Sequence, residues 1–271
     1  MKLLSLIKYT LKETYTALGF FGAIFGVVCI IDINTFIATI WGRIIFVLLI
    51  FGTSLLFGIL KVKSTRGVDL TLSNDSKIKI TFGDLFKQKD IIVIPVNRCF
   101  DTCADDKIIS LKSVHGIFIK NVFGGNVSEL ENQISDSLRR QKLTPVDTNG
   151  EKQGNHDVYP YGTVAEVSKD GKIYYLIALT KMNKNNEASC DLESYYAVII
   201  KLLNYIKTFS NGKTVSMPLI GSNFARLNKN KEFILDNLIS ILQMYDNHIT
   251  SDIQIIIHKN DRNCINLYNY K

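Results

Sequence analysis

The chain has 271 residues, of which 46% are hydrophobic, and its formal net charge at pH 7 is +7. This length allows one sizeable domain with an appendage. The basic residues form no run interleaved with aromatic residues, so the sequence predicts no nucleic-acid partner. The five cysteines are an odd number and are scattered along the chain, which favours reduced thiols and a cytoplasmic soluble part over a disulfide framework.

Residues 15–60 form an apolar block that carries only two charged residues, Asp32 and Arg43. A membrane-spanning helix needs about 20 predominantly apolar residues, and the block holds two such stretches on either side of a polar patch near Asp32. We therefore predict a transmembrane α-helical hairpin with spans at about 15–33 and 40–60. A signal peptide is the competing interpretation, but the run begins well inside the chain and a second span follows it.

Positive charge is concentrated on the outer flanks of this block and not in its connecting loop. Cytoplasmic flanks of membrane spans carry an excess of Lys and Arg, so we expect a multi-pass protein with both termini in the cytoplasm. The flanking residues are Lys2, Lys8, Lys12, Lys61, Lys63 and Arg66, against Arg43 in the loop.

Small residues recur at a spacing of four in both predicted spans. Gly22-x-x-x-Gly26 lies in the first span and Ser54-x-x-x-Gly58 in the second. Such spacing lets helix backbones approach closely, which would favour contacts between helices or between copies of the chain. Ordinary membrane glycines explain the same pattern equally well.

After residue 62 the pattern changes to short apolar runs that alternate with segments of helical spacing. We predict a membrane region over residues 1–62 and a second domain over 63–271, of the α/β class, with a mixed sheet between helices. Residues 145–156 are polar and contain two glycines, which predicts a mobile surface loop. Strands are expected at 68–72, 77–82, 90–97, 162–168, 172–179, 214–220 and 252–258, and helices at 127–142, 191–209 and 231–245.

The segment MPLIGSNFAR, residues 217–226, leaves an apolar strand and precedes a predicted helix. A glycine such as Gly221 lets the backbone come close to a ligand, and exposed backbone N–H groups at such a turn bind anions. The functional interpretation is a phosphate-binding loop. An ordinary strand-to-helix turn also explains the Gly-Ser-Asn sequence, because these are common turn residues.

Asp84 and Leu85, in GDLF, follow the apolar strand KIKITF directly. A carboxylate at such a turn can accept a hydrogen bond from an exocyclic amine, as on adenine. The alternative is that Asp84 only caps a backbone turn.

Together these segments resemble a macro domain, the fold that binds ADP-ribose and related nucleotides. The resemblance spans roughly residues 77–258 and rests on GDLF, VIPVN, YPYGTVAEV, YYLIALT and MPLIGSNFAR. It implies a macro-like three-layer α/β/α domain with a mixed sheet, preceded by the transmembrane hairpin. The ligand-binding residues that it implies are Asp84 and Leu85 on the adenine side, Asn97 on the ribose side, and Gly221, Ser222, Asn223, Phe224 and Arg226 in the phosphate loop.

The segment after Asn97 departs from the macro-domain pattern, because RCFDT stands where catalytic members carry a second Asn and then a glycine-rich run. Ser113, His115 and Gly116 are the candidates for a first phosphate loop, and Gly124-Gly125 is the alternative. A loop histidine without a role competes as the interpretation of His115. The missing hydrolase signature, with no Ser-His-Asp or metal-ligand cluster, predicts a protein without catalytic residues, metal or cofactor.

A two-helix hairpin followed by a divergent macro-like domain resembles the membrane-bound effector of bacterial Thoeris antiphage systems, most specifically in PVNRCFDT, KSVHGIFI and MPLIGSNFAR. The resemblance implies an inner-membrane sensor of an ADP-ribose conjugate, such as histidine-ADP-ribose, made from NAD by a TIR-domain enzyme. The implied output is disruption of the lipid bilayer, by a homo-oligomer, and death of the infected cell. The alternatives are a membrane-tethered enzyme that hydrolyses ADP-ribose from proteins or metabolites, and a passive tether for a nucleotide-binding module.

Overall fold

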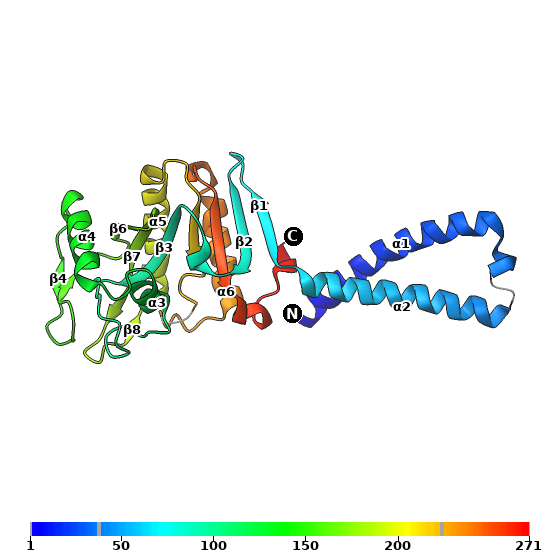
Figure 1. Cartoon of the computed structure of the whole chain (residues 1–271), viewed down its shortest axis with the longest axis horizontal. Coiled ribbons are helices and arrows are strands. Elements are labelled where there is room, and N and C mark those ends of the chain that lie inside the picture. Colours follow the sequence, from blue (N-terminus) through cyan, green and yellow to red (C-terminus); the bar gives the residue numbers. More distant parts are fainter. Residues whose placement is uncertain (1, 37–38, 223–224, 271) are drawn as a thin grey trace. The chain divides into compact units, whose positions relative to one another are not determined.

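The computed structural model describes residues 2–36, 39–222 and 225–270. The chain forms two compact units: residues 1–68 with the C-terminal residues 266–271, and residues 69–265 (Figure 1). The first unit therefore extends a few residues beyond the predicted membrane region and includes the C-terminal segment. We describe the two units separately.

The first unit consists mainly of two helices, α1 (Lys2–Phe36) and α2 (Ile40–Ser64), which lie side by side as a hairpin (Figure 1). Thr39 caps α2, because its side chain accepts a hydrogen bond from the Gly42 N–H at 3.1 Å. Among the residues that the structure describes, α2 is the one helix long and apolar enough to cross a membrane. The other predicted span, at about 15–33, lies in α1. The structure does not describe the side chains of α1 around Asp32.

The small residues of α2 lie in the contact between the two helices. A Cβ atom at Gly58 would lie 2.6 Å from Oγ1 of Thr14 and 2.9 Å from the carbonyl oxygen of Thr10, so only glycine fits there. Ser54 is fully buried in the same unit. By contrast, a Cβ atom added at Gly22 or Gly26 would meet no other atom within 4 Å. The two helices of one hairpin therefore approach each other closely at Ser54 and Gly58. The face of α1 that carries Gly22 and Gly26 is not part of this contact.

The second unit is built on a mixed sheet in the order β1-β2-β10-β9-β3-β7-β6, with the short strand β8 paired to β7. Each neighbouring pair in the run β2-β10-β9-β3-β7 is parallel, whereas β6 and β8 are antiparallel to β7. The predicted α/β class and mixed sheet are confirmed. The bounds are β1 Gly67–Thr71, β2 Lys77–Gly83, β3 Ile91–Asn97, β6 Val164–Lys169, β7 Lys172–Met182, β8 Ala188–Ser189, β9 Val215–Pro218 and β10 Ile253–His258.

Helices cover both faces of the sheet and make three layers. On one face α3 (Val114–Asn121) and α4 (Val127–Arg140) share a core cluster with β3, β6 and β7. Side chains alternate along a strand, so Tyr174 of β7 faces this cluster while its neighbour Tyr175 faces the other side. There Tyr175 contacts Tyr205, which lies on α5 (Leu192–Phe209), with ring centroids 5.0 Å apart. The fourth helix of this unit, α6 (Lys231–Met244), contacts α5.

Two local predictions need correction. Helix α3 occupies residues that the sequence pattern assigned to a loop, because its eight residues are too few for a clear apolar period and include Gly116. The segment at 145–156 is not simply a surface loop, because it contributes β4 (Asp147–Thr148) to a two-stranded hairpin with β5 (Asp157–Val158). That hairpin also carries a buried lysine, described below.

Candidate functional site

The carboxyl ends of the parallel strands meet at one edge of the sheet, and a cleft of about 930 Å³ opens there. Its walls come from the ends of β2, β3, β7, β9 and β10 and from the segments that follow them. In open α/β sheets ligands bind in the crevice outside the carboxyl ends of the strands. This position makes the cleft the candidate functional site.

Asp84 and Leu85 line the cleft next to the end of β2. Asp84 is exposed and caps the short 3-10 helix η1 (Leu85–Lys87), because one of its carboxylate oxygens accepts a hydrogen bond from the Phe86 N–H at 3.0 Å. Leu85 is buried and belongs to the core cluster beneath. The structure thus shows the cap, and it also leaves the Asp84 carboxylate in the wall of the cleft.

Asn97 ends β3 in the wall of the cleft, but its side chain is engaged within the protein. Its Nδ2 donates to Asp101 at 2.9 Å, and its Oδ1 accepts from the backbone N–H groups of Cys99 at 3.1 Å and of Asp101 at 3.3 Å. These three hydrogen bonds close the turn after β3. The amide of Asn97 therefore fixes the shape of the cleft wall.

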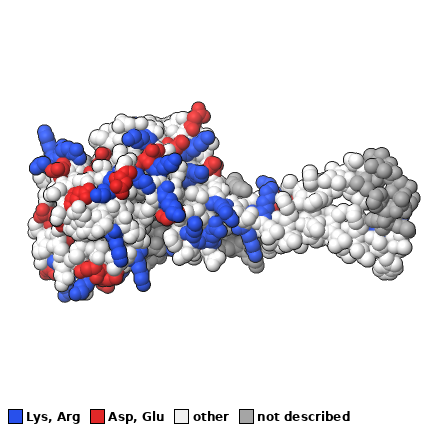
Figure 2. All heavy atoms as spheres, in the orientation of Figure 1, with Lys and Arg blue, Asp and Glu red and all other residues white. Residues whose placement is uncertain are grey.

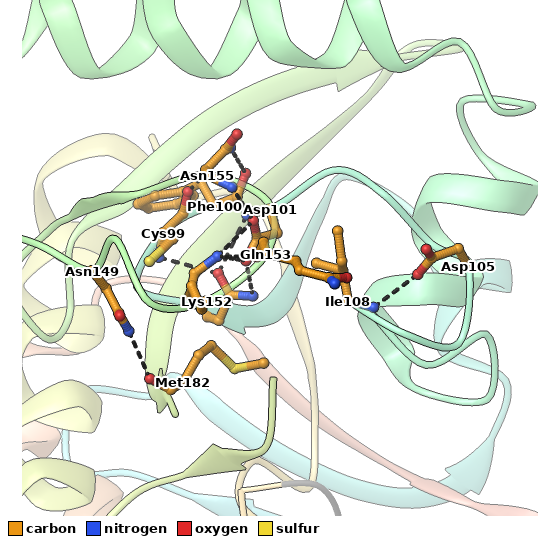
Figure 3. Close-up of polar contacts among 11 residues, drawn as sticks. Cys99, Phe100, Asp101, Asp105, Ile108, Asn149, Lys152, Gln153, Asn155 and Met182 are labelled. Atoms are coloured by element: carbon orange, nitrogen blue, oxygen red, sulfur yellow. Dashed lines mark hydrogen bonds and ion pairs between the residues drawn. The ribbon is translucent and has the colours of Figure 1, made fainter. Parts of the chain in front are cut away.

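A buried ion pair includes Asp101, the hydrogen-bond partner of Asn97, and it was not predicted from the sequence. The Nζ of Lys152 lies 2.9 Å from Oδ2 of Asp101, and their side chains are 0% and 1% exposed (Figure 3). The same Nζ donates to the Gln153 carbonyl at 2.8 Å, and the Asn155 N–H donates to Oδ1 of Asp101 at 2.6 Å. A buried charge is costly unless it is paired and hydrogen-bonded, and here both conditions are met.

The loop that carries Lys152 is held at both ends. Asn149 donates to the carbonyl of Met182 at 2.9 Å, at the carboxyl end of β7, and Asn155 donates to the carbonyl of Phe100 at 3.1 Å (Figure 3). Gly154 has a φ of 88°, and a Cβ there would lie 2.3 Å from Oδ1 of Asp101. This part is therefore not simply a surface loop, because hydrogen bonds anchor it and Lys152 is buried.

Ser113 and His115 line the cleft at the start of α3. Ser113 caps the helix by accepting a hydrogen bond from the Gly116 N–H at 2.9 Å. His115 is buried, and burial lowers its pKa to about 3, so its imidazole is neutral at pH 7. Gly116 does not line the cleft. A Cβ there would lie 2.2 Å from the Ser110 carbonyl oxygen, so this glycine permits close packing.

The alternative first phosphate loop, Gly124-Gly125, follows α3 and does not line the cleft. Gly124 has a φ of 59° and Gly125 a φ of 77°. Both values lie in the left-handed region that favours glycine. The pair therefore serves the turn between α3 and α4.

Gly221 and Ser222 lie in the cleft wall after β9. Gly221 has a φ of 86°, and a Cβ there would lie 2.6 Å from Leu227, so a larger residue is excluded by both conformation and space. The Ser222 N–H donates to the Leu219 carbonyl at 3.2 Å, which makes a tight turn. The next helix, α6, begins at Lys231, which agrees with the helix predicted at 231–245. Asn223 and Phe224 lie outside the described residues.

Charged side chains of both signs line the cleft. Arg226 lies 3.3 Å from Glu187, and Lys231 lies 2.5 Å from Asp261. A hydrogen bond from Asn183 and then the Arg226 charge lower the pKa of Glu187. The other lysines in the lining are Lys87, Lys107, Lys112 and Lys259.

Among the described residues, no group of three His, Cys, Asp or Glu side chains could hold a metal ion.

Two solved macrodomain structures are similar to this chain. A macrodomain variant from Oceanobacillus iheyensis, determined with ADPR, is 12% identical and has a TM-score of 0.51, covering 73% of this chain and 94% of that chain. The same organism's macrodomain with ADP is also 12% identical, with a TM-score of 0.49, and covers 73% of this chain and 92% of that chain. By its fold, the second unit is a macro domain.

Comparison of sequences places the chain more narrowly. The family described as "Thoeris protein ThsA, Macro domain" matches residues 78–258, and the chain belongs to this family. Thoeris protein ThsA of Bacillus amyloliquefaciens (strain Y2) is 28% identical over an alignment of 242 residues, and the match covers 84% of this chain and 79% of that relative. The resemblance to a Thoeris macro-domain effector is confirmed, and with it a place in antiviral defence.

Proposed function

We propose that this protein is a membrane-anchored effector whose macro domain senses an NAD-derived ADP-ribose conjugate and then disrupts the membrane of the infected cell. The observation that carries the proposal is the cleft at the carboxyl edge of the sheet, in a member of the ThsA macro-domain family. Its volume of about 930 Å³ lies within the range of small-molecule sites.

The chemistry of the cleft suits a nucleoside diphosphate. Asp84 offers a carboxylate that can accept a hydrogen bond from an adenine amine. Gly221 and the first residues of α3, Val114 and His115, bring backbone N–H groups to the cleft, where anions bind favourably. Lys107 and Lys112 add positive charge near α3. Both kinds of group line one cleft, which supports a ligand that carries both a base and phosphates.

We propose that the ligand sensed by the macro domain is histidine-ADP-ribose, or a closely similar conjugate, made by a partner TIR-domain enzyme. Membership of the Thoeris family supports a functional link to that enzyme. Calorimetry on the purified full-length protein tests this step. We expect tighter binding of histidine-ADP-ribose than of ADP-ribose, and weaker binding of the conjugate than of ADP-ribose would contradict the choice of signal.

We propose binding without turnover. The Asn97 amide is held by three hydrogen bonds within the protein. The imidazole of His115, with a pKa near 3, is a poor general base at neutral pH. Both observations support a sensor over a hydrolase. Release of free ADP-ribose from an ADP-ribosylated substrate by the purified protein would favour the enzyme instead.

The membrane part of the proposal rests on the helical unit. Large apolar side chains are exposed on both helices, and most of the described surface of the hairpin is white, neither acidic nor basic, in Figure 2. Exposed apolar surface of this kind marks contact with a membrane or a protein. We propose an inner-membrane hairpin with both termini in the cytoplasm. Cysteine labelling from outside intact cells should modify Asn34→Cys and spare Cys264, and the reverse pattern would contradict this topology.

A further inference from the structure

The C-terminal segment of the chain contacts the N-terminal helix through a buried tyrosine. Tyr268 lies in the 3-10 helix η4 (Leu267–Tyr270), and its hydroxyl donates a hydrogen bond to Oε1 of Glu13 on α1. The ring of Tyr268 also contacts Tyr9, one helical turn before Glu13, with centroids 5.0 Å apart. Tyr268 and Glu13 are 3% and 8% exposed, so this contact is largely shielded from water.

Glu13 joins this contact to the second helix of the hairpin. Its other carboxylate oxygen lies 2.6 Å from Nζ of Lys61 on α2. Burial and then the Glu13 carboxylate raise the pKa of Tyr268 to about 12, so its hydroxyl keeps the proton that it donates at neutral pH. A buried carboxylate is stable only when it is paired, and Tyr268 of the C-terminal segment and Lys61 of α2 are both partners of Glu13.

The same segment is the direct continuation of one wall of the cleft. The residues from His258 to Asp261 line the cleft, and Asp261 is tied to Lys231, at the start of α6, by an ion pair of 2.5 Å. Ile265, the last residue of the macro-domain unit, is buried. Only Asn266 separates it from Leu267, which is buried in turn. Five residues, 262–266, lie between Asp261 and Leu267, so a short stretch of backbone joins the cleft wall to the segment that carries Tyr268.

We propose that residues 266–270 form a latch that couples the cleft to the helical hairpin. The latched contact among Tyr268, Glu13 and Lys61 holds α1 to α2. A ligand that displaces the residues from His258 to Asp261 pulls on Asn266 and releases Tyr268 from Glu13. The ligand thereby favours the unlatched form by its differential affinity for the two forms. This coupling rests on the proposed function, because it requires a nucleotide in the cleft.

Coupling between two sites is reciprocal, so it can be measured either at the latch or as nucleotide affinity. Nucleotide binding should weaken the latch, and weakening the latch should strengthen nucleotide binding. Tyr268→Phe removes only the hydroxyl and keeps the ring that contacts Tyr9. A hydrogen bond to a charged group is worth at least about tenfold in an equilibrium constant, which sets the expected size of the effect.

The experiment is hydrogen–deuterium exchange on the full-length protein in nanodiscs, with and without histidine-ADP-ribose, followed by calorimetry. In the wild type we expect the nucleotide to accelerate exchange at 266–270 and at 8–14 by roughly tenfold. In Tyr268→Phe we expect this faster exchange without nucleotide, and a several-fold higher affinity for it. Tyr15→Phe is the matched control, because Tyr15 lies on α1 two residues from Glu13, is 75% exposed and should change neither quantity.

The two possible failures are distinguishable. If the nucleotide binds but exchange at 266–270 stays the same, or if Tyr268→Phe binds it no more tightly than Tyr15→Phe, the latch is wrong and the sensor remains. If calorimetry detects no binding of histidine-ADP-ribose or ADP-ribose to the wild type, the proposed function fails and the coupling fails with it.

Discussion

Lys152 and Asp101 form a buried ion pair across 51 positions of the sequence, with 2.9 Å between Nζ and Oδ2. The pair ties the loop between β4 and β5 to the turn after β3, directly behind Asn97. Asn97 in turn forms part of the cleft wall. The shape of the candidate site at β3 therefore depends on a loop that the sequence pattern identifies only as polar.

The first prediction concerns this pair. Lys152→Met should lower the free energy of unfolding of the macro domain by about 3–5 kcal/mol, because Asp101 is left buried without its counter-ion. Lys184→Met, at an exposed lysine, should stay within about 0.5 kcal/mol of the wild type. Denaturant unfolding of the purified protein in detergent measures both. A loss below about 1 kcal/mol for Lys152→Met would show that the pair is not buried in solution.

The second prediction concerns pH. Burial lowers the pKa of His115 to about 3, whereas an unfolded histidine has a pKa of about 6.5. Above pH 6.5 the imidazole is neutral in both states, and its contribution to stability is fully present. As the pH falls below 6.5 the unfolded chain takes up a proton that the folded chain refuses, so stability falls by about 1.4 kcal/mol per pH unit until about pH 3.

Unfolding free energies measured at pH 7.5 and 5.5 test this titration. His115→Phe should remove most of the decrease, because the buried titrating group is gone. His156→Gln, at an exposed position, should keep it. An equal decrease in the wild type and His115→Phe would show that other groups cause the pH dependence.

The third prediction concerns the base end of the ligand. Asp84→Ala should weaken binding of histidine-ADP-ribose about five- to a hundredfold, because a ligand hydrogen bond of about 1–3 kcal/mol is lost. Asp170→Asn, in the turn between β6 and β7 and outside the cleft lining, should leave the affinity unchanged. Calorimetry compares the variants. Equal affinity for the wild type and Asp84→Ala would remove Asp84 from the site.

Much of the sheet could be predicted because its strands are continuous apolar runs that end in recognisable residues. Asp84, Asn97 and Gly221 follow such runs, and parallel pairing brings all three to the same edge. The positions of these residues in the cleft therefore agree with the local pattern. What each side chain contacts there was harder to predict, as Asn97 shows with its hydrogen bonds directed to its own turn.

The features that sequence reasoning missed depend on distant partners or on short helices. Lys152 looks like any solvated lysine until Asp101 is placed beside it, and Tyr268 reaches Glu13 across 255 positions. Helix α3 is short, and its Gly116 resembles a loop glycine although it packs against Ser110. In each case the deciding information is tertiary packing, which no local period contains.

The fourth prediction concerns contacts between copies of the hairpin. A Cβ at Gly22 or Gly26 meets no other atom within 4 Å, so the combined change to Leu should leave the fold and nucleotide affinity intact. If these glycines let helices of different copies approach closely, the same change should suppress membrane leakage. Gly58→Leu is the contrasting variant, because its side chain would collide with Thr14 inside one hairpin. Unreduced leakage in the Gly22 and Gly26 variant would exclude that helix face from assembly.

The central claim is that a nucleotide in the macro-domain cleft makes this protein disrupt membranes. The direct measurement is dye release from liposomes that carry the full-length protein, with and without histidine-ADP-ribose. We predict release that depends on the nucleotide and that shifts to higher nucleotide concentration in Asp84→Ala. Equal release with and without the nucleotide, in liposomes whose protein binds it by calorimetry, would contradict the claim.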